Sequence, residues 1–250
     1  MKNNLEIAIK AARAGAAHAL KYYKSDIEVE FKENLSPVTI ADKEAEEVIK
    51  NIILEQDPSA KFVGEESGGN FDEEKYWLID PIDGTGFFIR GIPMWGTLLS
   101  YIESGQAVTA VSYLPLLDEL LYAKKDKGAY LNDFPIKVSG IEKVSKAMLT
   151  HGSIHKIIDK LPGIIELSKK SHKMKGISES YGYHLLATGR TEGVFDGGAS
   201  PWDVAGLNMI VEEAGGKVTN FKGNKWSIHD NNIIATNGLI HDEILKILAE

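Results

Sequence analysis

Two aspartates stand three residues apart directly after an apolar segment, and a glycine and a threonine follow them. The segment 77–85 has the sequence Trp-Leu-Ile-Asp-Pro-Ile-Asp-Gly-Thr. Pro81 cannot donate to a sheet ladder, so it marks the end of a predicted strand. Acids at a strand end lie where ligands bind in α/β folds, and two close carboxylates favour a shared cation such as Mg²⁺, Mn²⁺ or Ca²⁺. An Asp-Gly surface turn is the alternative.

Gly84 adds a second feature to this strand end. A glycine lets the backbone approach an anion closely, and consecutive N–H groups in a tight turn bind anions. A metal site beside such a turn predicts a phosphate ester as the ligand.

Acids also adjoin two other predicted elements. The segment 61–69, Lys-Phe-Val-Gly-Glu-Glu-Ser-Gly-Gly, is a short strand followed by acids and glycines. A solvated loop is the alternative there, but beside Asp80 and Asp83 the metal interpretation is favoured. Asp42 stands just before a helical pattern at residues 43–49, and taken alone it is best explained as the N-cap of that helix.

Composition limits the classes of function. The chain has 250 residues, 43% of them hydrophobic, with no cysteine and a net charge of -8. No thiolate site can form, and the negative charge argues against non-specific nucleic-acid binding. No apolar run approaches the ~18 residues of a membrane span, and residues 1–20 form a charged amphipathic helix rather than a signal peptide. We therefore expect a cytoplasmic protein with no nucleic-acid or membrane partner.

The pattern of elements changes near residue 140. Before it, helical segments and strands that we expect to pair antiparallel form a helix pair on a sheet; after it, shorter strands alternate with helices. We predict two tightly packed halves, 1–139 with most of the metal ligands and 140–250 with Asp203 and the substrate contacts. The expected helices are 5–20, 43–49, 154–168, 181–189, 202–214 and 241–249, a loop is expected at 34–39, and the expected strands are 27–31, 61–63, 77–80, 98–102, 107–113, 119–123, 128–132, 136–138, 147–150, 194–196 and 233–236.

Four motifs in register resemble the inositol monophosphatase-like family of metal-dependent phosphatases. They are residues 37–42, residues 63–67, residues 80–85, and residues 202–206 together with 211–216. Their order and spacing cover nearly the whole chain. The resemblance implies an α/β layered sandwich of αβαβα type, a homodimer, and a small phosphorylated metabolite as the substrate.

The resemblance also implies metal ligands. Glu65, Asp80 and the carbonyl oxygen of Ile82 would hold one Mg²⁺ ion. Asp80, Asp83 and Asp203 would hold a second, with Asp80 bridging the two. A third, weaker site would use Glu65 and water, and Mn²⁺ is an alternative metal. Two metals of this kind clamp the entering and leaving oxygens of an in-line displacement.

Catalytic and phosphate-binding roles follow from the same resemblance. Thr85 and Asp42 would orient and deprotonate the attacking water, with Glu65 assisting through the third metal, so Asp42 would be more than a cap. The backbone N–H groups of Gly84 and Thr85 would hold the phosphate. No phosphorylated enzyme is expected.

Two segments favour the histidinol-phosphate phosphatase branch of the family. One is 86–98, Gly-Phe-Phe-Ile-Arg-Gly-Ile-Pro-Met-Trp-Gly-Thr-Leu, although Gly86 replaces the usual lysine or threonine. The other begins at Glu179, where that branch has aspartate and inositol phosphatases have a small residue. Glu179 and Glu213 would bind a cationic amino alcohol. The alternatives are a helix-start carboxylate for Glu179 and a surface charge for Arg90.

We therefore predict a Mg²⁺-dependent phosphomonoesterase that acts on histidinol phosphate. Such an enzyme would have a role in histidine biosynthesis. Inositol 1-phosphate and fructose bisphosphate or other sugar phosphates are alternative substrates. A non-catalytic module that binds metal or a phosphorylated metabolite is the remote alternative.

Overall fold

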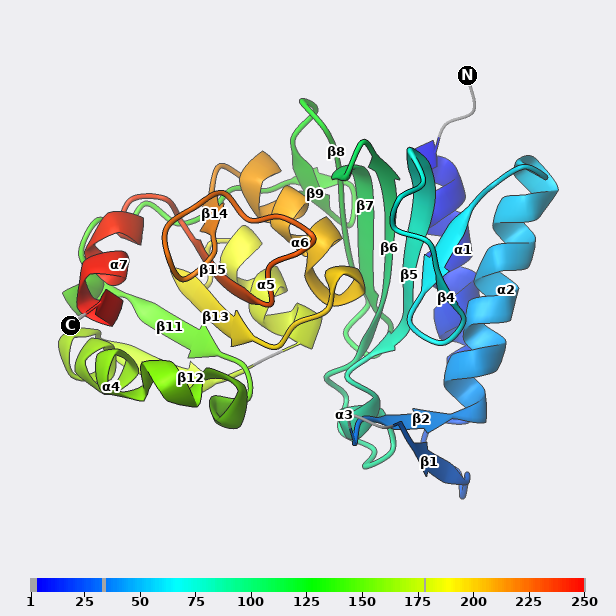
Figure 1. The fold of residues 1–250 in the computed structure, drawn as a ribbon, viewed down its shortest axis with the longest axis horizontal. Coiled ribbons are helices and arrows are strands. Elements are labelled where there is room, and N and C mark those ends of the chain that lie inside the picture. The colour runs from blue at the N-terminus through cyan, green and yellow to red at the C-terminus, as the bar shows by residue number, and fades with distance from the viewer. Residues whose placement is uncertain (1–3, 33–34, 178, 250) are drawn as a thin grey trace.

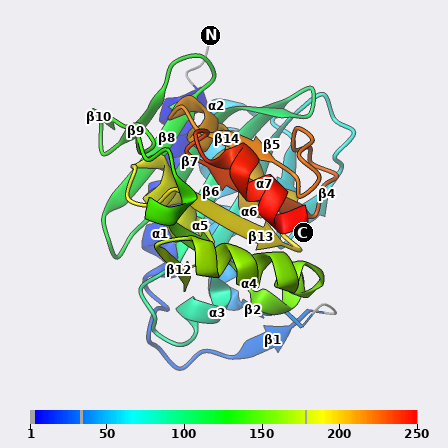
Figure 2. The same cartoon turned by 90° about the vertical axis from the view of Figure 1, so that its left-hand side faces the viewer.

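The computed structural model describes residues 4–32, 35–177 and 179–249 of the chain. Its helices and sheets form five layers in the order αβαβα (Figure 1). Helices α1 and α2 cover one face of an eight-stranded sheet, and α6 packs on its other face against β7. Helix α5 lies beside α6 against β13 of a five-stranded sheet, whose outer side carries α4 and α7 (Figure 2). This arrangement confirms the predicted layered α/β sandwich.

The bounds of the elements are as follows. The α-helices are α1 Asn4–Ala19, α2 Ile40–Gln56, α3 Thr85–Phe88, α4 Leu161–Lys170, α5 Glu179–Ala187, α6 Pro201–Glu213 and α7 His241–Ala249, with short 3₁₀ helices at Val144–Lys146 and Ile154–Lys160. The strands are β1 Val29–Phe31, β2 Pro37–Thr39, β3 Phe62–Gly64, β4 Gly68–Gly69, β5 Lys75–Asp83, β6 Gly96–Glu103, β7 Gln106–Leu114, β8 Glu119–Lys124, β9 Ala129–Leu131, β10 Phe134–Pro135, β11 Met148–His151, β12 Lys173–Gly176, β13 Gly193–Gly197, β14 Lys217–Thr219 and β15 Asn232–Thr236.

The larger sheet has the order β10-β9-β8-β7-β6-β5-β3-β4, and the smaller sheet has the order β12-β11-β13-β15-β14. The first was predicted to be antiparallel throughout, but β3 and β5 run parallel, because β4 turns back beside β3 and the chain then turns again to enter β5 in the direction of β3. Within the described part of the chain, no helix is long and apolar enough to cross a membrane.

Small side chains hold the first two helices close together. The buried face of α1 is mostly alanine, and a Cβ atom added at Gly15 would lie 2.6 Å from Cγ1 of Ile49 on α2. This close approach lets both helices rest on the sheet and fixes the start of α2, where Asp42 lies.

Several predicted elements differ from the structure. Residues 37–39 form β2 rather than a loop, and residues 136–138 are not a strand, since β10 ends at Pro135. The sequence analysis also missed β12 and β14, whose exposed lysines hide the apolar pattern of an edge strand. The residues between β10 and β11 contain no strand and connect the two sheets. The exact boundary at 139/140 stays a prediction.

Candidate active site

The parallel pairing of β3 and β5 places Glu65 beside Asp80. Gly64 is opposite Ile79 in the register, and the backbone N–H of Glu65 donates to the carbonyl oxygen of Ile79 at 3.0 Å. The next residues along the two strands, Glu65 and Asp80, are therefore neighbours at the same sheet edge. The pairing of β3 with β5 therefore brings together two acids that are 15 residues apart in the sequence.

A β-bulge brings the second aspartate of the motif to the same region. Asp80 pairs with Leu98 and Asp83 pairs with Gly96, so β5 has one more residue than β6 between these points. Strict alternation would put Asp80 and Asp83 on opposite faces, and one extra residue restores the same side. Pro81 lies within the bulge, where its missing N–H costs no ladder hydrogen bond.

Helix α6 carries Asp203 in its first turn. Ser200 and Asp203 form a capping box, in which the backbone N–H of Ser200 donates to Oδ2 of Asp203 at 2.8 Å. Pro201 begins the helix at a position where no N–H is needed. The acid thus reaches the site from the C-terminal half of the chain.

These acids shift each other's protonation. Burial, followed by the charges of Glu65 and Asp83, raises the pKa of Asp80 well above its usual value. Burial also raises the pKa of Asp83 well above its usual value, and that of Asp203 to about 8. Such groups are costly as bare anions, and a shared divalent cation removes that cost.

The donor atoms fit a hard metal ion. Asp80 is 2% exposed, and its Oδ1 atom has no hydrogen-bond partner among the described residues. Carboxylate and carbonyl oxygens, which these residues supply, are the ligands of Mg²⁺ and similar ions. We regard the orphaned oxygen as the atom best placed to accept a cation.

The predicted ligands also have other contacts. Within the described ranges, no three histidine or acidic side chains are already arranged as a set of metal ligands. Oδ2 of Asp83 accepts from the N–H of Ser180 at 2.6 Å, and Oε1 of Glu65 accepts from Nζ of Lys32 at 2.9 Å. Binding a cation therefore requires Glu65 to share its carboxylate with Lys32 or release it.

Thr85 and Asp42 form a direct hydrogen bond. The hydroxyl of Thr85 lies 3.0 Å from Oδ1 of Asp42 and 3.0 Å from the carbonyl oxygen of Ile82. Burial raises the pKa of Asp42, against the lowering effect of hydrogen bonds from Thr39 and Thr85. The interpretation of Asp42 as the N-cap itself is wrong: Thr39 is the N-cap of α2, and Asp42 is the third helical residue of its capping box. One carboxylate oxygen closes the cap and the other meets Thr85.

Gly84 adopts the left-handed conformation, with φ 86°, and precedes the short helix α3. The first N–H groups of a helix have no partner within it, which is the feature expected of a phosphate-binding turn. A Cβ atom at Gly84 would lie 3.4 Å from Cγ of Glu179, so the two residues are in contact distance. Glu179 begins α5 with a φ of 54°, unusual for a non-glycine residue.

Glu213 is not brought to this site. It is the last residue of α6, ten positions after Asp203, a distance of about 15 Å along the helix. Its carboxylate accepts N–H bonds of 2.7, 3.1 and 2.7 Å from Asp126, Lys127 and Gly128. The pairing of Glu213 with Glu179 is therefore corrected: Glu213 holds the turn between β8 and β9.

Asp196 occupies the position that we had expected of Glu213. It lies on β13 and lines a small cavity together with Glu179, Tyr183 and Asp203. Burial and the charge of Glu179 raise its pKa to about 7, opposed by Lys156. The sequence analysis missed it, although Val-Phe-Asp-Gly-Gly repeats the signal of an acid between a strand and glycines.

A wider cavity of about 280 Å³ adjoins the small one. Glu179 and Ser153 line both, and Phe87 and Arg90 line only the wider one. Nη1 of Arg90 donates to the carbonyl oxygen of Gly86 at 2.8 Å. Arg90 is exposed but borders the space beside Gly84, where the organic part of a phosphate ester would extend.

Comparison with known proteins gives consistent matches. The model of the inositol monophosphatase family matches residues 1–250. A histidinol-phosphatase of Chlorobaculum parvum is 32% identical, over 99% of this chain and 97% of that protein. A fructose-1,6-bisphosphatase/inositol-1-monophosphatase of Thermotoga maritima is 34% identical, over 85% of this chain and 82% of that protein. The structure of a Thermotoga maritima IMPase superposes with a TM-score of 0.92 at 31% identity, covering 99% of this chain and 97% of that one.

Proposed function

The chain belongs to the inositol monophosphatase family of metal-dependent phosphatases, which hydrolyse phosphomonoesters, and we propose that its substrate is histidinol phosphate. The observation that carries this proposal is the pair of acids Glu179 and Asp196, which line one cavity, with Glu179 at contact distance from Gly84. A cationic amino alcohol gains from two nearby carboxylates, whereas a neutral polyol needs only hydrogen bonds. Burial and the neighbouring charge of Glu179 raise the pKa of Asp196 to about 7, and a cationic group bound there would favour its ionised form.

We propose that the metal is Mg²⁺, with two or three ions held by Glu65, Asp80, Asp83, Asp203 and the carbonyl oxygen of Ile82. Bound there, the ions would neutralise phosphate charge and favour the ionised form of the attacking water. The orphaned Oδ1 of Asp80 and the raised pKa values of Asp80 and Asp83 support this ligand set.

The chain's own residues would position the water and the ester. The Thr85 hydroxyl donates to Asp42 and can accept a hydrogen bond from a water, so a proton leaving the water passes to Thr85 as the Thr85 proton passes to Asp42. The water oxygen bonds to phosphorus while the P–O bond to the ester oxygen breaks, and the departing oxygen takes a proton from solvent to become the alcohol. The turn at Gly84 and Thr85 holds the phosphate through N–H groups, and Glu179 orients the departing amino alcohol.

Inositol 1-phosphate and sugar phosphates are the second candidates, and Arg90 at the wider cavity favours the bisphosphates among them. A guanidinium there favours an additional anionic group, such as the second phosphate of a bisphosphate. The 34% identical Thermotoga maritima relative is named for that pair of activities. We further propose a cytoplasmic homodimer, on the basis of the family resemblance and of the composition.

Substitution of the two acids tests the substrate. We expect Glu179→Gln and Asp196→Asn each to lower kcat/KM for histidinol phosphate about ten- to a hundredfold, the effect of one charge-assisted hydrogen bond of about 1.5–3 kcal/mol. Hydrolysis of inositol 1-phosphate should change little. The measurement is phosphate release from both substrates at saturating Mg²⁺.

Glu213→Gln is the matched control, because Glu213 lies at the far end of α6 and should leave both substrates unaffected. Equal losses on both substrates in the Glu179 and Asp196 variants would indicate a damaged metal site. If the wild-type protein preferred inositol 1-phosphate or fructose 1,6-bisphosphate, the proposal of histidinol phosphate as the substrate would be wrong.

A further inference from the structure

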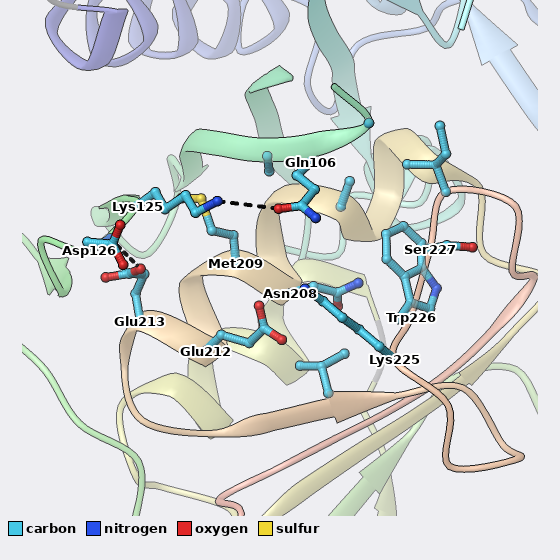
Figure 3. Close-up of a pocket in the computed structure, with 15 residues that line it drawn as sticks. Gln106, Lys125, Asp126, Asn208, Met209, Glu212, Glu213, Lys225, Trp226 and Ser227 are labelled. Carbon is cyan, nitrogen blue, oxygen red and sulfur yellow. Dashed lines mark hydrogen bonds between the residues drawn. The ribbon is translucent and has the colours of Figure 1, made fainter. Parts of the chain in front are cut away.

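A third cavity lies on α6, away from the acidic cluster of Glu65, Asp80, Asp83 and Asp203 (Figure 3). It has a volume of about 270 Å³ and lies between the β6–β7 turn, the C-terminal part of α6 and the segment that connects β14 with β15. Asn208 is five residues after Asp203, which places it about 7.5 Å further along α6 and on a different side of the helix. Ligands at the two places would therefore not overlap.

The unusual residue of this cavity is Asn208. It is 5% exposed, and neither its Oδ1 nor its Nδ2 atom has a hydrogen-bond partner among the described residues. A buried primary amide with neither group bonded is costly, and such groups are rare in native proteins. Asn237 shows the usual case. It is 3% exposed, and its side-chain amide forms hydrogen bonds with Ser139, Ile141 and Leu239.

The walls of the cavity suit a flat polar molecule. Figure 3 shows the indole of Trp226 beside the amide of Asn208, with Gln106 and Glu212 turned toward the same space. The ring offers a stacking surface, and the amide presents an adjacent donor and acceptor in one plane. That pattern matches the edge of adenine, which carries an amino donor next to a ring-nitrogen acceptor.

Charge narrows the class of ligand further. Lys125 and Lys225 line the cavity with Asp126, Glu212 and Glu213, so its charged residues sum to -1. A phosphate group would gain no net attraction there, and the volume is near the lower limit of small-molecule sites. The two amide atoms are also buried, so a ligand reaches them only if a neighbouring side chain moves. Trp226 lies in the segment between β14 and β15, which has no helix or strand.

We propose that this cavity is a binding site for an uncharged adenine-type heterocycle, which inserts between Trp226 and Asn208 and pairs with both atoms of the Asn208 amide. Such a ligand would contact α6, the helix that carries Asp203 at its other end. The proposal does not rest on the substrate of the phosphatase.

Calorimetry with two nucleosides tests the pairing. We expect adenosine to bind the full-length protein and purine riboside, which lacks the 6-amino donor, to bind about five- to 150-fold more weakly. Saturating inorganic phosphate and Mg²⁺ should leave adenosine binding unchanged, since neither nucleoside carries a phosphate for the acidic cluster. Equal affinity of the two nucleosides, or no binding of adenosine, would overturn the proposal.

Asn208→Leu, which keeps the branching of the side chain and replaces its two polar atoms with methyl groups, provides a second readout. In the ligand-free protein it removes two unsatisfied groups, so we expect the melting temperature to rise while adenosine binding is lost. Asn237→Leu is the matched control, and it should lower the melting temperature because it leaves the partners of Asn237 unbonded. A fall in melting temperature for Asn208→Leu as large as for Asn237→Leu, or unchanged adenosine binding, would show that the amide has only a structural role.

Discussion

The acids Asp80, Asp83 and Asp203 and the group formed by Glu119, His184 and Arg190 both bury ionisable side chains, but the first set gathers like charges whereas the second pairs a carboxylate with a guanidinium. Glu119 accepts bonds of 2.9 Å from both terminal nitrogens of Arg190 and lies 3.1 Å from Nδ1 of His184. The other ring nitrogen of His184 lies 2.8 Å from the hydroxyl of Ser112. Every polar atom of the buried imidazole is therefore bonded.

The pKa values of the two regions shift in opposite directions. The bonds from His184 and Arg190 outweigh burial and lower the pKa of Glu119 to about 2. In the acidic cluster burial is reinforced by like charges, and the pKa of Asp203 rises to about 8. Burial alone therefore does not identify a functional site; burial with uncompensated charge does.

Helix α5 connects the two regions. Its first residues meet the acidic cluster, where Ser180 donates to Asp83, and its middle carries His184. The partners of His184 lie on β7 and β8, so the paired group fixes α5 against the larger sheet. A fully paired group thus positions a site whose charges are left for a ligand.

Asp80→Asn should cause the largest change, because it removes a charge from the residue proposed to bridge two metals. We expect phosphate release to fall to the level of the buffer control at every Mg²⁺ concentration. Wild-type protein should gain about 2.7 kcal/mol of stability when Mg²⁺ exceeds its Kd a hundredfold, and the variant should lose most of this gain. Thermal melts with EDTA and with Mg²⁺ measure it.

The fold of Asp80→Asn should survive, since the substitution lowers repulsion among buried acids. An unchanged circular dichroism spectrum is the control. Near-normal hydrolysis at low Mg²⁺ would show that the acidic cluster is not the catalytic metal site, and the contrast between the two regions would then carry no functional meaning.

Thr85→Ala should have the next largest effect and should separate catalysis from metal binding. Loss of the hydroxyl bonded to Asp42 removes the proton relay, which typically contributes ~10²–10⁴-fold to turnover. Affinity for Mg²⁺, measured by calorimetry, should change little. Thr85→Ser keeps the hydroxyl and should retain most of the turnover; if both variants lost metal affinity in step with turnover, Thr85 would belong to the metal site instead.

The sequence was sufficient to predict the layers, and the acids that it singled out as metal ligands lie close enough in the structure to raise the pKa of Asp80. Glu65, Asp83 and Asp203 each adjoin the end of a strand or helix, and Gly84 marks one of those ends. The strand end predicted at Pro81 is wrong, because β5 continues through Asp80 and Pro81 to Asp83. What the sequence did not reveal was the bulge between Asp80 and Asp83, because a one-residue irregularity depends on the partner strand.

The errors on the substrate side have a similar cause. Glu213 and Asp196 both precede glycines or small residues, but helix α6 carries Glu213 about 15 Å from Asp203, while β13 brings Asp196 beside Glu179. Which acid faces the site depends on how α6 and β13 pack, and no local pattern reports that. The unpaired amide of Asn208 was equally hidden, since its surroundings come from three distant segments.

Glu119→Gln should give the smallest effect, on stability rather than chemistry. It weakens the bonds to Arg190 and His184 in a half-buried group, so we expect the free energy of unfolding at pH 7 to fall by about 1–3 kcal/mol in urea titrations. Glu103→Gln, in the exposed pair with Lys75, is the matched control and should cost no more than about 1 kcal/mol.

The pH dependence of that loss separates the two regions. Because the pKa of Glu119 is lowered from 4.5 to about 2 in the folded protein, its contribution is complete above pH 4.5 and disappears as the pH falls toward 2. The difference in unfolding free energy between wild type and Glu119→Gln should therefore shrink over that window.

The pH dependence contributed by Asp203, whose pKa is raised to about 8, has the opposite sign. In EDTA its burial destabilises the folded protein most above pH 8, and this destabilisation declines as the pH falls toward 4. A difference between wild type and Glu119→Gln that stayed constant from pH 7 to pH 3 would mean that Glu119 is not held as a paired carboxylate, and the proposed anchor of α5 would fail.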